Sequence, residues 1–223
     1  CPADLVTEVD RHSQSFMVDL LGRAFPGHRL VAEEDCPGDE LHLDDRSAWI
    51  IDPLDGTTNF VFGIPLCTVT AALVKDSAPV LGVTYDPFRD ELYHAVKGKG
   101  AFLNGQRITV DSIRDSVCQS LINTGYPSSE AFKDEMWQAN FKKILYKAID
   151  LRAFGSAALE LAYIACGRLT GYWEVKLRPW DVAAGILLVE EAGGKISRLD
   201  GSPLKLDNYV SIVASNSLIH QEL

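Results

Sequence analysis

Residues 65–108 read as a series of short β-strands, and this feature constrains the fold most. Apolar, β-branched runs alternate there with turn dipeptides, a pattern typical of antiparallel hairpins. The runs cover residues 68–74, 80–85 and 91–96, and the turns lie at Asp76-Ser77, Asp86-Pro87, Lys97-Gly98 and Asn104-Gly105. We therefore expect an antiparallel meander over this part of the chain.

Helices are predicted before and after the meander in the sequence. The first covers residues 7–27, where Thr7 is placed to cap it, and two more cover residues 156–167 and 180–194. The apolar stripe of the first is Met17, Leu20, Leu21 and Ala24, and that of the second is Ala158, Leu161, Ala162 and Ala165. A further polar, helical stretch is expected within residues 127–150. Strands mixed with separated helices favour a layered α/β fold of mixed α+β type.

The length of 223 residues suits one large domain or two closely packed lobes with a substantial core. We expect a single compact unit over residues 1–223. Two lobes are expected within it, over residues 1–120 and residues 121–223.

Charge and cysteine content limit the classes of partner and the compartment. Asp and Glu number 31 against 21 for Lys and Arg, so the net charge is −10, and nucleic acid is an unlikely partner. The five cysteines form no Cys-x-x-Cys pair, which fits a reducing, cytoplasmic location, or an organelle if a transit peptide has been removed. No apolar run is long enough to cross a bilayer, so no membrane association is expected.

The segment Asp52-Pro53-Leu54-Asp55-Gly56-Thr57-Thr58-Asn59 carries most of the functional signal. A short apolar strand over residues 48–51 would deliver Asp52 at its end, and the turn formed by Pro53 and Gly56 would bring Asp55 beside it. Two carboxylates this close repel each other unless a divalent cation lies between them. A helix starting at Gly56-Thr57 would direct free N–H groups at a phosphate.

Each acid also has an ordinary structural interpretation. Asp52 and Asp55 could be turn formers, Asp181 a helix cap, and Glu33-Glu34 a solvated loop after the strand at residues 30–32. Asp10 could serve only to complete a capping box with Thr7. Several acids at strand ends and helix starts favour convergence on one site, because ligand groups meet at those positions in layered folds.

Other catalytic motifs are absent from the sequence. Two residues separate Asp52 from Asp55, whereas haloacid-dehalogenase phosphatases need one, and there is no Walker A loop, no Gly-x-Ser-x-Gly elbow and no zinc-binding His pair. Gly98-Lys99-Gly100 is interpreted as a hairpin turn. The candidate ligands are all oxygen donors, which indicates Mg²⁺ or Mn²⁺ rather than zinc.

With these motifs in view, the sequence resembles the inositol monophosphatase family of the lithium-sensitive phosphatase superfamily. Two long motifs carry the resemblance, at residues 49–60 and 180–194, with supporting matches at residues 4–10, 33–34 and 155–158. The resemblance runs from Asp4 nearly to the end of the chain. It implies an α-β-α-β-α sandwich and a Mg²⁺-dependent phosphatase that binds two or three ions, is inhibited by Li⁺ and forms a homodimer. Residues 1–120 would then form the metal- and phosphate-binding lobe, and residues 121–223 the substrate-side lobe.

The resemblance also implies roles for individual residues. The implied metal ligands are Glu33, Asp52, the Leu54 carbonyl, Asp55 and Asp181, with Glu34 as an additional candidate. Thr57, assisted by Glu33 and paired with Asp10, would orient the attacking water. The implied phosphate contacts are Asp55, Gly56 and Thr57, and the implied contacts to substrate hydroxyls are Asp55, Ala157, Glu174 and Asp181.

Substrate choice is less constrained than the reaction. Thr58 and Glu174 resemble the inositol-phosphatase branch, so inositol monophosphate is the first expectation for a small phosphorylated polyol or sugar substrate. Histidinol phosphate, fructose 1,6-bisphosphate and a nucleotide bisphosphate are alternatives, as is a regulatory homologue that binds a protein or RNA. The sequence departs from the family at Phe62, often His there, and in the basic segment at residues 176–179, which would suit a second anionic group. We expect the family's leading helix to be absent.

Overall fold

The computed structural model describes residues 6–36, 47–125 and 135–223. Its helices are α1 (Glu8–Ala24), α2 (Thr57–Val61), α3 (Glu135–Lys147), α4 (Ala157–Ala165) and α5 (Pro179–Glu191), with short 3₁₀ turns at Glu33–Asp35 and Val117–Gln119. Its strands are β1 (Arg29–Ala32), β2 (Ala48–Asp55), β3 (Thr68–Lys75), β4 (Ala78–Asp86), β5 (Glu91–Val96), β6 (Gly100–Leu103), β7 (Gln106–Ile108), β8 (Leu121–Thr124), β9 (Asp150–Arg152), β10 (Gly171–Leu177), β11 (Lys195–Ser197) and β12 (Val210–Ser215).

The strands form two sheets that both contain parallel and antiparallel pairs. The first has the order β1-β2-β3-β4-β5-β6-β7, and β3 to β7 are the predicted antiparallel meander. The second has the order β11-β12-β10-β8-β9, with β8 parallel to both of its neighbours. The predicted turns are confirmed, since Asp76, Ser77, Asn104 and Gly105 all have positive φ at the hairpin tips.

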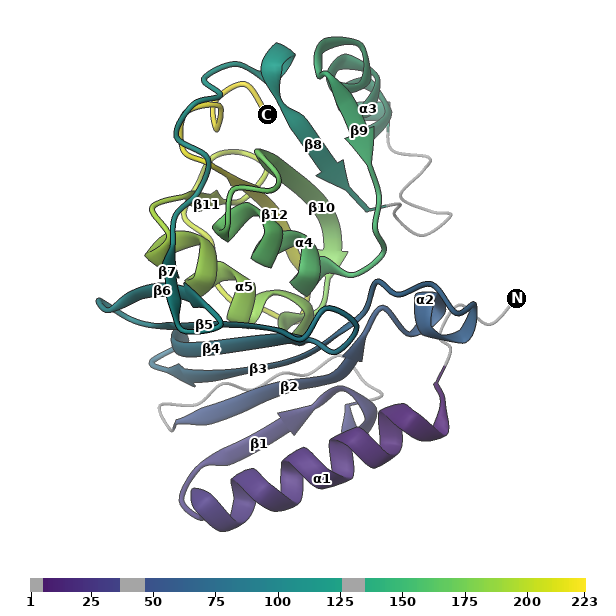
Figure 1. Ribbon diagram of the computed structural model, residues 1–223, viewed down its shortest axis with the longest axis vertical. Helices are drawn as coiled ribbons and strands as arrows, with labels where there is room; N and C mark the ends of the chain where they lie inside the picture. The colour runs from purple at the N-terminus through teal and green to yellow at the C-terminus, as the bar shows by residue number, and fades with distance from the viewer. Residues whose placement is uncertain (1–5, 37–46, 126–134) are drawn as a thin grey trace.

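Successive side chains along each strand point to opposite faces of the sheet, so each sheet packs against helices on both faces. The two sheets therefore lie between three layers of helices. Ile51 of β2 packs with the α1 residues, whereas its neighbour Ile50 packs with Trp180 and Ala184 of α5 on the other face. In the second sheet, residues of β10 and β12 alternate in the same way between α4 and α5 on one face and α3 on the other. The order α1, sheet, α4 and α5, sheet, α3 is the expected α-β-α-β-α sandwich (Figure 1).

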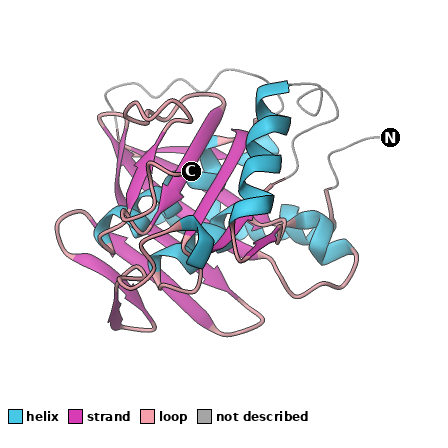
Figure 2. Ribbon diagram, turned by 90° about the horizontal axis from the view of Figure 1, so that it is seen from above, coloured by secondary structure: helices cyan, strands magenta, loops and turns pink. Residues whose placement is uncertain are grey.

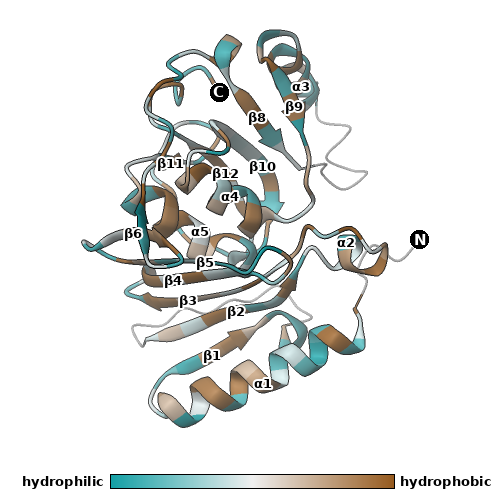
Figure 3. Ribbon diagram, viewed as in Figure 1, coloured by the Kyte–Doolittle hydropathy of each residue, from teal (hydrophilic) through white to brown (hydrophobic). Residues whose placement is uncertain are grey.

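The view from above shows α3 lying alongside the strands of the second sheet, against which it packs (Figure 2). Colouring by hydropathy shows apolar residues along β2, β3 and the two central helices (Figure 3). No helix in the described part of the chain combines the length and apolarity needed to cross a membrane.

The central helix α4 is more deeply buried than its sequence pattern indicated. The predicted apolar stripe is buried, but so is every other residue of the helix, including the acid Glu160. Sheets on both sides leave α4 no solvent face, so a stripe pattern underestimated its burial. Because α5 also contacts both sheets, we propose that the two expected lobes fold as one unit.

Helix α5 packs closely against the first sheet at Gly82 of β4. A Cβ atom at Gly82 would lie 2.8 Å from the Ala184 carbonyl oxygen and 2.9 Å from the Ala184 Cα. These are backbone atoms of a buried helix, so they cannot rotate away. The absence of a side chain at Gly82 therefore sets how near α5, which carries Asp181, lies to β2.

We predict that Gly82→Ala lowers the free energy of unfolding by about 1–3 kcal/mol, because the added methyl group forces α5 away from the sheet. Urea denaturation followed by circular dichroism measures the change. Gly27→Ala is the matched control, since a Cβ there meets no atom within 4 Å. Equal stability of the two variants would contradict the close packing at Gly82.

Candidate active site

An irregularity at the end of β2 brings two carboxylates to the same side of the chain. Asp52 pairs with Thr70 and Asp55 with Thr68, so three steps along β2 match two along β3. In a regular strand, residues three apart face opposite sides. The Asp52 carboxylate also accepts a 2.9 Å hydrogen bond from the Leu54 N–H, which fixes the bend. The strand thus continues to Asp55, whereas the sequence predicted that it ends at Asp52.

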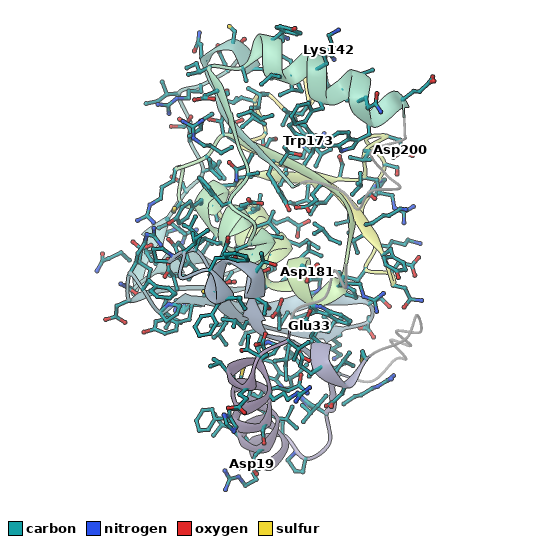
Figure 4. All side chains as sticks on the ribbon, turned by 90° about the vertical axis from the view of Figure 1, so that its right-hand side faces the viewer. Asp19, Glu33, Lys142, Trp173, Asp181 and Asp200 are labelled. Atoms are coloured by element: carbon teal, nitrogen blue, oxygen red, sulfur yellow. The ribbon has the colours of Figure 1, made fainter. Side chains whose placement is uncertain are left out.

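Asp181, in the first turn of α5, lies close to Asp52 and Asp55. Pro179 occupies the first turn of the helix, and the Asp181 carboxylate accepts a 2.7 Å hydrogen bond from the Arg178 N–H. Carboxylate oxygens of Asp52, Asp55 and Asp181 all lie within 4.8 Å of one another. Glu33, in the 3₁₀ turn after β1, lies beside Asp181 where the first sheet meets the central helices (Figure 4).

The acids line a cavity of about 380 Å³. Its lining residues are Glu33, Asp52, Leu54, Asp55, Gly56, Thr57, Asn59, Gly125, Ala153, Phe154, Gly155, Ser156, Ala157, Glu174, Leu177 and Asp181. Both sheets, α4 and α5 contribute to this set. No Lys, Arg or His is among these residues, so the described walls of the cavity carry only negative charge.

Burial raises the pKa values of all four clustered acids, and repulsion between them adds to the rise for Glu33, Asp52 and Asp181. Burial raises the pKa of Glu33 to about 7, against a lowering contact with Asp52, and the charge of Asp55 adds to the rise. The pKa values of Asp52 and Asp181 rise well above the usual range for the same reasons. A divalent cation would offset this repulsion, and an all-carboxylate donor set fits Mg²⁺.

Asp55 is held by the start of α4. Its carboxylate accepts hydrogen bonds from the Ser156 hydroxyl at 2.6 Å and from the Ala158 N–H at 2.8 Å. These donors limit the rise in its pKa, caused by burial, to about 6. The Ser156 side chain makes no capping bond to its own helix. No role in the site was predicted for Ser156, although the motif match at residues 155–158 pointed to this segment.

Asp10 has both of the roles that the sequence left open. One carboxylate oxygen accepts a 2.8 Å hydrogen bond from the Thr7 N–H and completes the capping box of α1. The other accepts the Thr57 hydroxyl at 3.0 Å, and this hydroxyl also lies 3.0 Å from the Leu54 carbonyl oxygen. Asp10 is fully buried, so the pair is shielded from bulk solvent.

Gly56 makes the turn between β2 and α2 possible. Its φ of +95° is left-handed, and a Cβ there would lie 2.9 Å from the Leu66 carbonyl oxygen. The predicted helix start at Thr57 is confirmed, although α2 has only five residues. Asn59 then donates to carbonyl oxygens of Leu66 at 2.7 Å and Phe154 at 2.6 Å. This bridge across 95 residues had no signal in the sequence beyond membership of the motif.

Glu174 lies on β10 at the other side of the cavity from β2. The Tyr172 hydroxyl donates a hydrogen bond to it, and burial raises its pKa to about 7. Gly125 makes room for this carboxyl group, since a Cβ at Gly125 would overlap it. Ala157 also lines the cavity, whereas Glu34 does not, and the Glu34 N–H instead donates to Gln14.

The basic segment at residues 176–179 is directed elsewhere than the cavity. The Arg178 guanidinium lies 4.7 Å from the ring centroids of both Trp180 and Tyr209. Lys176 is exposed, and only Leu177 of this segment lines the cavity. The suggestion that these cations recruit a second anionic group finds no support in their positions.

Comparison with known proteins decides the family. The model of the inositol monophosphatase family matches residues 2–223. The chain belongs to the inositol monophosphatase family. It is a phosphoric monoester hydrolase, as the resemblance implied.

Relatives in bacteria span nearly all of the chain. Inositol-1-monophosphatase from Synechocystis is 42% identical over 220 residues, which cover 99% of this chain and 75% of that protein. Nus factor SuhB from Escherichia coli is 40% identical over 220 residues, covering 96% and 78%. The structure of inositol monophosphatase from Anabaena superposes with a TM-score of 0.90 at 40% identity, covering 97% of this chain and 84% of that one.

We predict that the metal-free protein loses stability as the pH rises from about 4.5 to about 7. Glu33, with its pKa raised from 4.5 to about 7, binds more protons folded than unfolded in this window, so the folded state is favoured at the acidic end. The loss is on the order of 3 kcal/mol from Glu33 alone.

Thermal denaturation in EDTA across this pH range measures the effect. Mg²⁺ should restore the stability at neutral pH, and Glu33→Gln should flatten the pH dependence in EDTA. A melting temperature that rises between pH 4.5 and pH 7 without metal would show that the acids are not repelling one another.

Proposed function

We propose that this protein hydrolyses inositol monophosphate to inositol and phosphate, with Mg²⁺ as its cofactor. The observation that carries the proposal is the meeting of Asp52, Asp55 and Asp181 in a cavity whose far side holds Glu174. The carboxylates can hold cations beside a phosphate, and Glu174 can accept hydrogen bonds from a polyol.

Five groups would hold two or three Mg²⁺ ions: Glu33, Asp52, the Leu54 carbonyl, Asp55 and Asp181. Bound there, Mg²⁺ supplies the charge that stabilises the phosphoryl group and that eases deprotonation of water. Mn²⁺ has compatible ligand preferences, and we expect Li⁺ to inhibit. The chain's own contribution is to hold these ligands in place and to orient the reactants.

We assign to Thr57 the role of orienting the attacking water. Its hydroxyl donates a hydrogen bond to the Asp10 carboxyl group, so its oxygen is left to accept a hydrogen bond from the water. Glu33, on the same side of the cavity, would take part as the second acceptor. The N–H groups of Gly56 and Thr57 would bind phosphate oxygens.

The cavity favours a substrate with one phosphate and an uncharged alcohol. A second phosphate needs a cation, and the described lining has none. Glu174 and Ala157 are suited to contact hydroxyl groups on the alcohol side. Fructose 1,6-bisphosphate and nucleotide bisphosphates are therefore weaker candidates, and histidinol phosphate is the alternative with a single phosphate.

The test is phosphate release from a panel containing inositol monophosphate, histidinol phosphate, fructose 1,6-bisphosphate and a nucleotide bisphosphate. We expect activity only with Mg²⁺ or Mn²⁺, inhibition by Li⁺, and the highest kcat/KM for inositol monophosphate. Failure of every monoester to be hydrolysed with Mg²⁺ would refute the phosphatase, and a different ranking would reassign its substrate.

Asp181→Asn supplies the control within this experiment. Removing one of three clustered carboxylates should lower kcat/KM at least about 100-fold. Asp19→Asn is matched in chemistry, and Asp19 lies at the far end of the molecule on α1, where it pairs with Arg23 (Figure 4). That variant should keep full activity.

A second, regulatory role is favoured by one of the relatives, which is named Nus factor SuhB. The net charge of −10 disfavours direct contact with RNA, so a protein partner fits better. We expect a partner that binds the wild type in a pull-down to bind Asp55→Asn equally well, because the surface is unchanged while catalysis is lost. A partner lost together with activity would argue against an independent role.

The assembly and compartment are further proposals. The family resemblance leads us to propose a homodimer, whose mass light scattering would report. The cysteines at positions 36, 67, 118 and 166 are all free thiols, which supports a reducing compartment such as the cytoplasm.

A further inference from the structure

Residues 153–157 form one wall of the cavity, and this wall is held at Phe154 from two sides. The Phe154 carbonyl oxygen accepts a 2.6 Å hydrogen bond from Nδ2 of Asn59. The Phe154 N–H donates a 2.7 Å hydrogen bond to Oε1 of Glu160. One contact comes from α2 beside the phosphate-binding turn and the other from α4, so two separate elements fix the 153–157 wall.

Glu160 is a buried acid that the proposed metal site does not use. The residue is 1% exposed and does not line the cavity. Besides Phe154, its Oε1 accepts a 2.8 Å hydrogen bond from Nδ2 of Asn123 on β8. Burial raises its pKa well above the usual range, and the negative charge of Glu174 on β10 raises it further.

An acid at this position requires an explanation. The other residues of α4 are apolar or aromatic, and burying a carboxyl group is unfavourable unless it is hydrogen-bonded. The Asn123 amide and the Phe154 N–H that donate to Glu160 are both neutral, and no ion pair with a described residue accounts for the acid. What the carboxyl group provides is an acceptor for a main-chain N–H in the wall of the cavity.

We propose that Glu160 is a positioning residue for the alcohol end of the substrate, which fixes the 153–157 wall through Phe154 so that Ala157 faces Glu174. The inference rests on the proposed function, in which Ala157 and Glu174 contact substrate hydroxyl groups. Glu160 itself touches no substrate. Its effect passes through the main chain of the wall.

The phosphate end of the cavity has supports of its own. The Leu54 N–H holds Asp52 at 2.9 Å, and Asn59 is anchored to the Leu66 carbonyl oxygen at 2.7 Å. Neither contact involves Glu160. Loss of the Glu160 acceptor should therefore disturb binding of the alcohol more than binding of phosphate.

The experiment compares two ligands on three full-length proteins in saturating Mg²⁺. The proteins are the wild type, Glu160→Gln and Glu160→Met, and the measurements are KM for inositol monophosphate and the inhibition constant of inorganic phosphate. Met fills a similar volume without an acceptor, so we expect KM to rise about tenfold while the phosphate constant changes less than about twofold. Gln keeps an acceptor oxygen, and its KM should stay within about threefold of the wild type.

Folding is checked by circular dichroism and thermal denaturation, and Glu160→Ala serves as a second variant if Glu160→Met does not fold. Equal changes in KM and in the phosphate constant, or no change in either for a folded variant, would overturn the positioning role. If the wild type hydrolyses another monoester but not inositol monophosphate, the proposed substrate fails, and the same comparison on that monoester still decides the role of Glu160.

Discussion

The repulsion between buried carboxylates is the constraint on which the site depends. Asp52, Asp55 and Asp181 bring their oxygens within 4.8 Å of one another, with Glu33 beside them. Nothing in the described lining of the cavity neutralises them. They are instead held by neutral donors, the N–H groups of Leu54, Ala158 and Arg178 and the hydroxyl of Ser156. Such donors orient a carboxylate without cancelling its charge, so the charge remains available to a cation.

The layered fold is what makes this arrangement possible. Asp52 and Asp55 come from the first sheet, Asp181 from a central helix and Glu174 from the second sheet. Each sheet has an apolar core on both of its faces, and the stability of those cores offsets the unfavourable burial of the acids. The close contact of α5 with β4 at Gly82 then fixes the separation between ligands that lie far apart in the chain.

The sequence predicted the parts of this structure that local patterns encode. The meander, α1, α4, α5 and the Asp52–Asn59 turn were visible in periodicity, caps and turn residues, and the motifs identified the acids. Long-range contacts were not visible, because the hydrogen bond of Asn59 to Phe154 spans 95 residues and that of Ser156 to Asp55 spans 101. The burial of Glu160 was missed as well, since a helix enclosed by two sheets loses the polar face that a stripe pattern assumes.

The negative charge of the cavity also bears on the order in which a cation and a substrate would bind. A phosphate monoester is an anion, and the lining that it meets in the metal-free protein includes five carboxyl groups and no cation, namely Glu33, Asp52, Asp55, Glu174 and Asp181. Repulsion between the anionic substrate and the carboxylates of the lining would oppose entry of the substrate until the acids have bound cations. The N–H groups at Gly56 and Thr57 are neutral and cannot reverse this balance alone. Under the proposed function, cation binding would therefore precede substrate binding, and the clustered acids would make the phosphate site conditional on the metal.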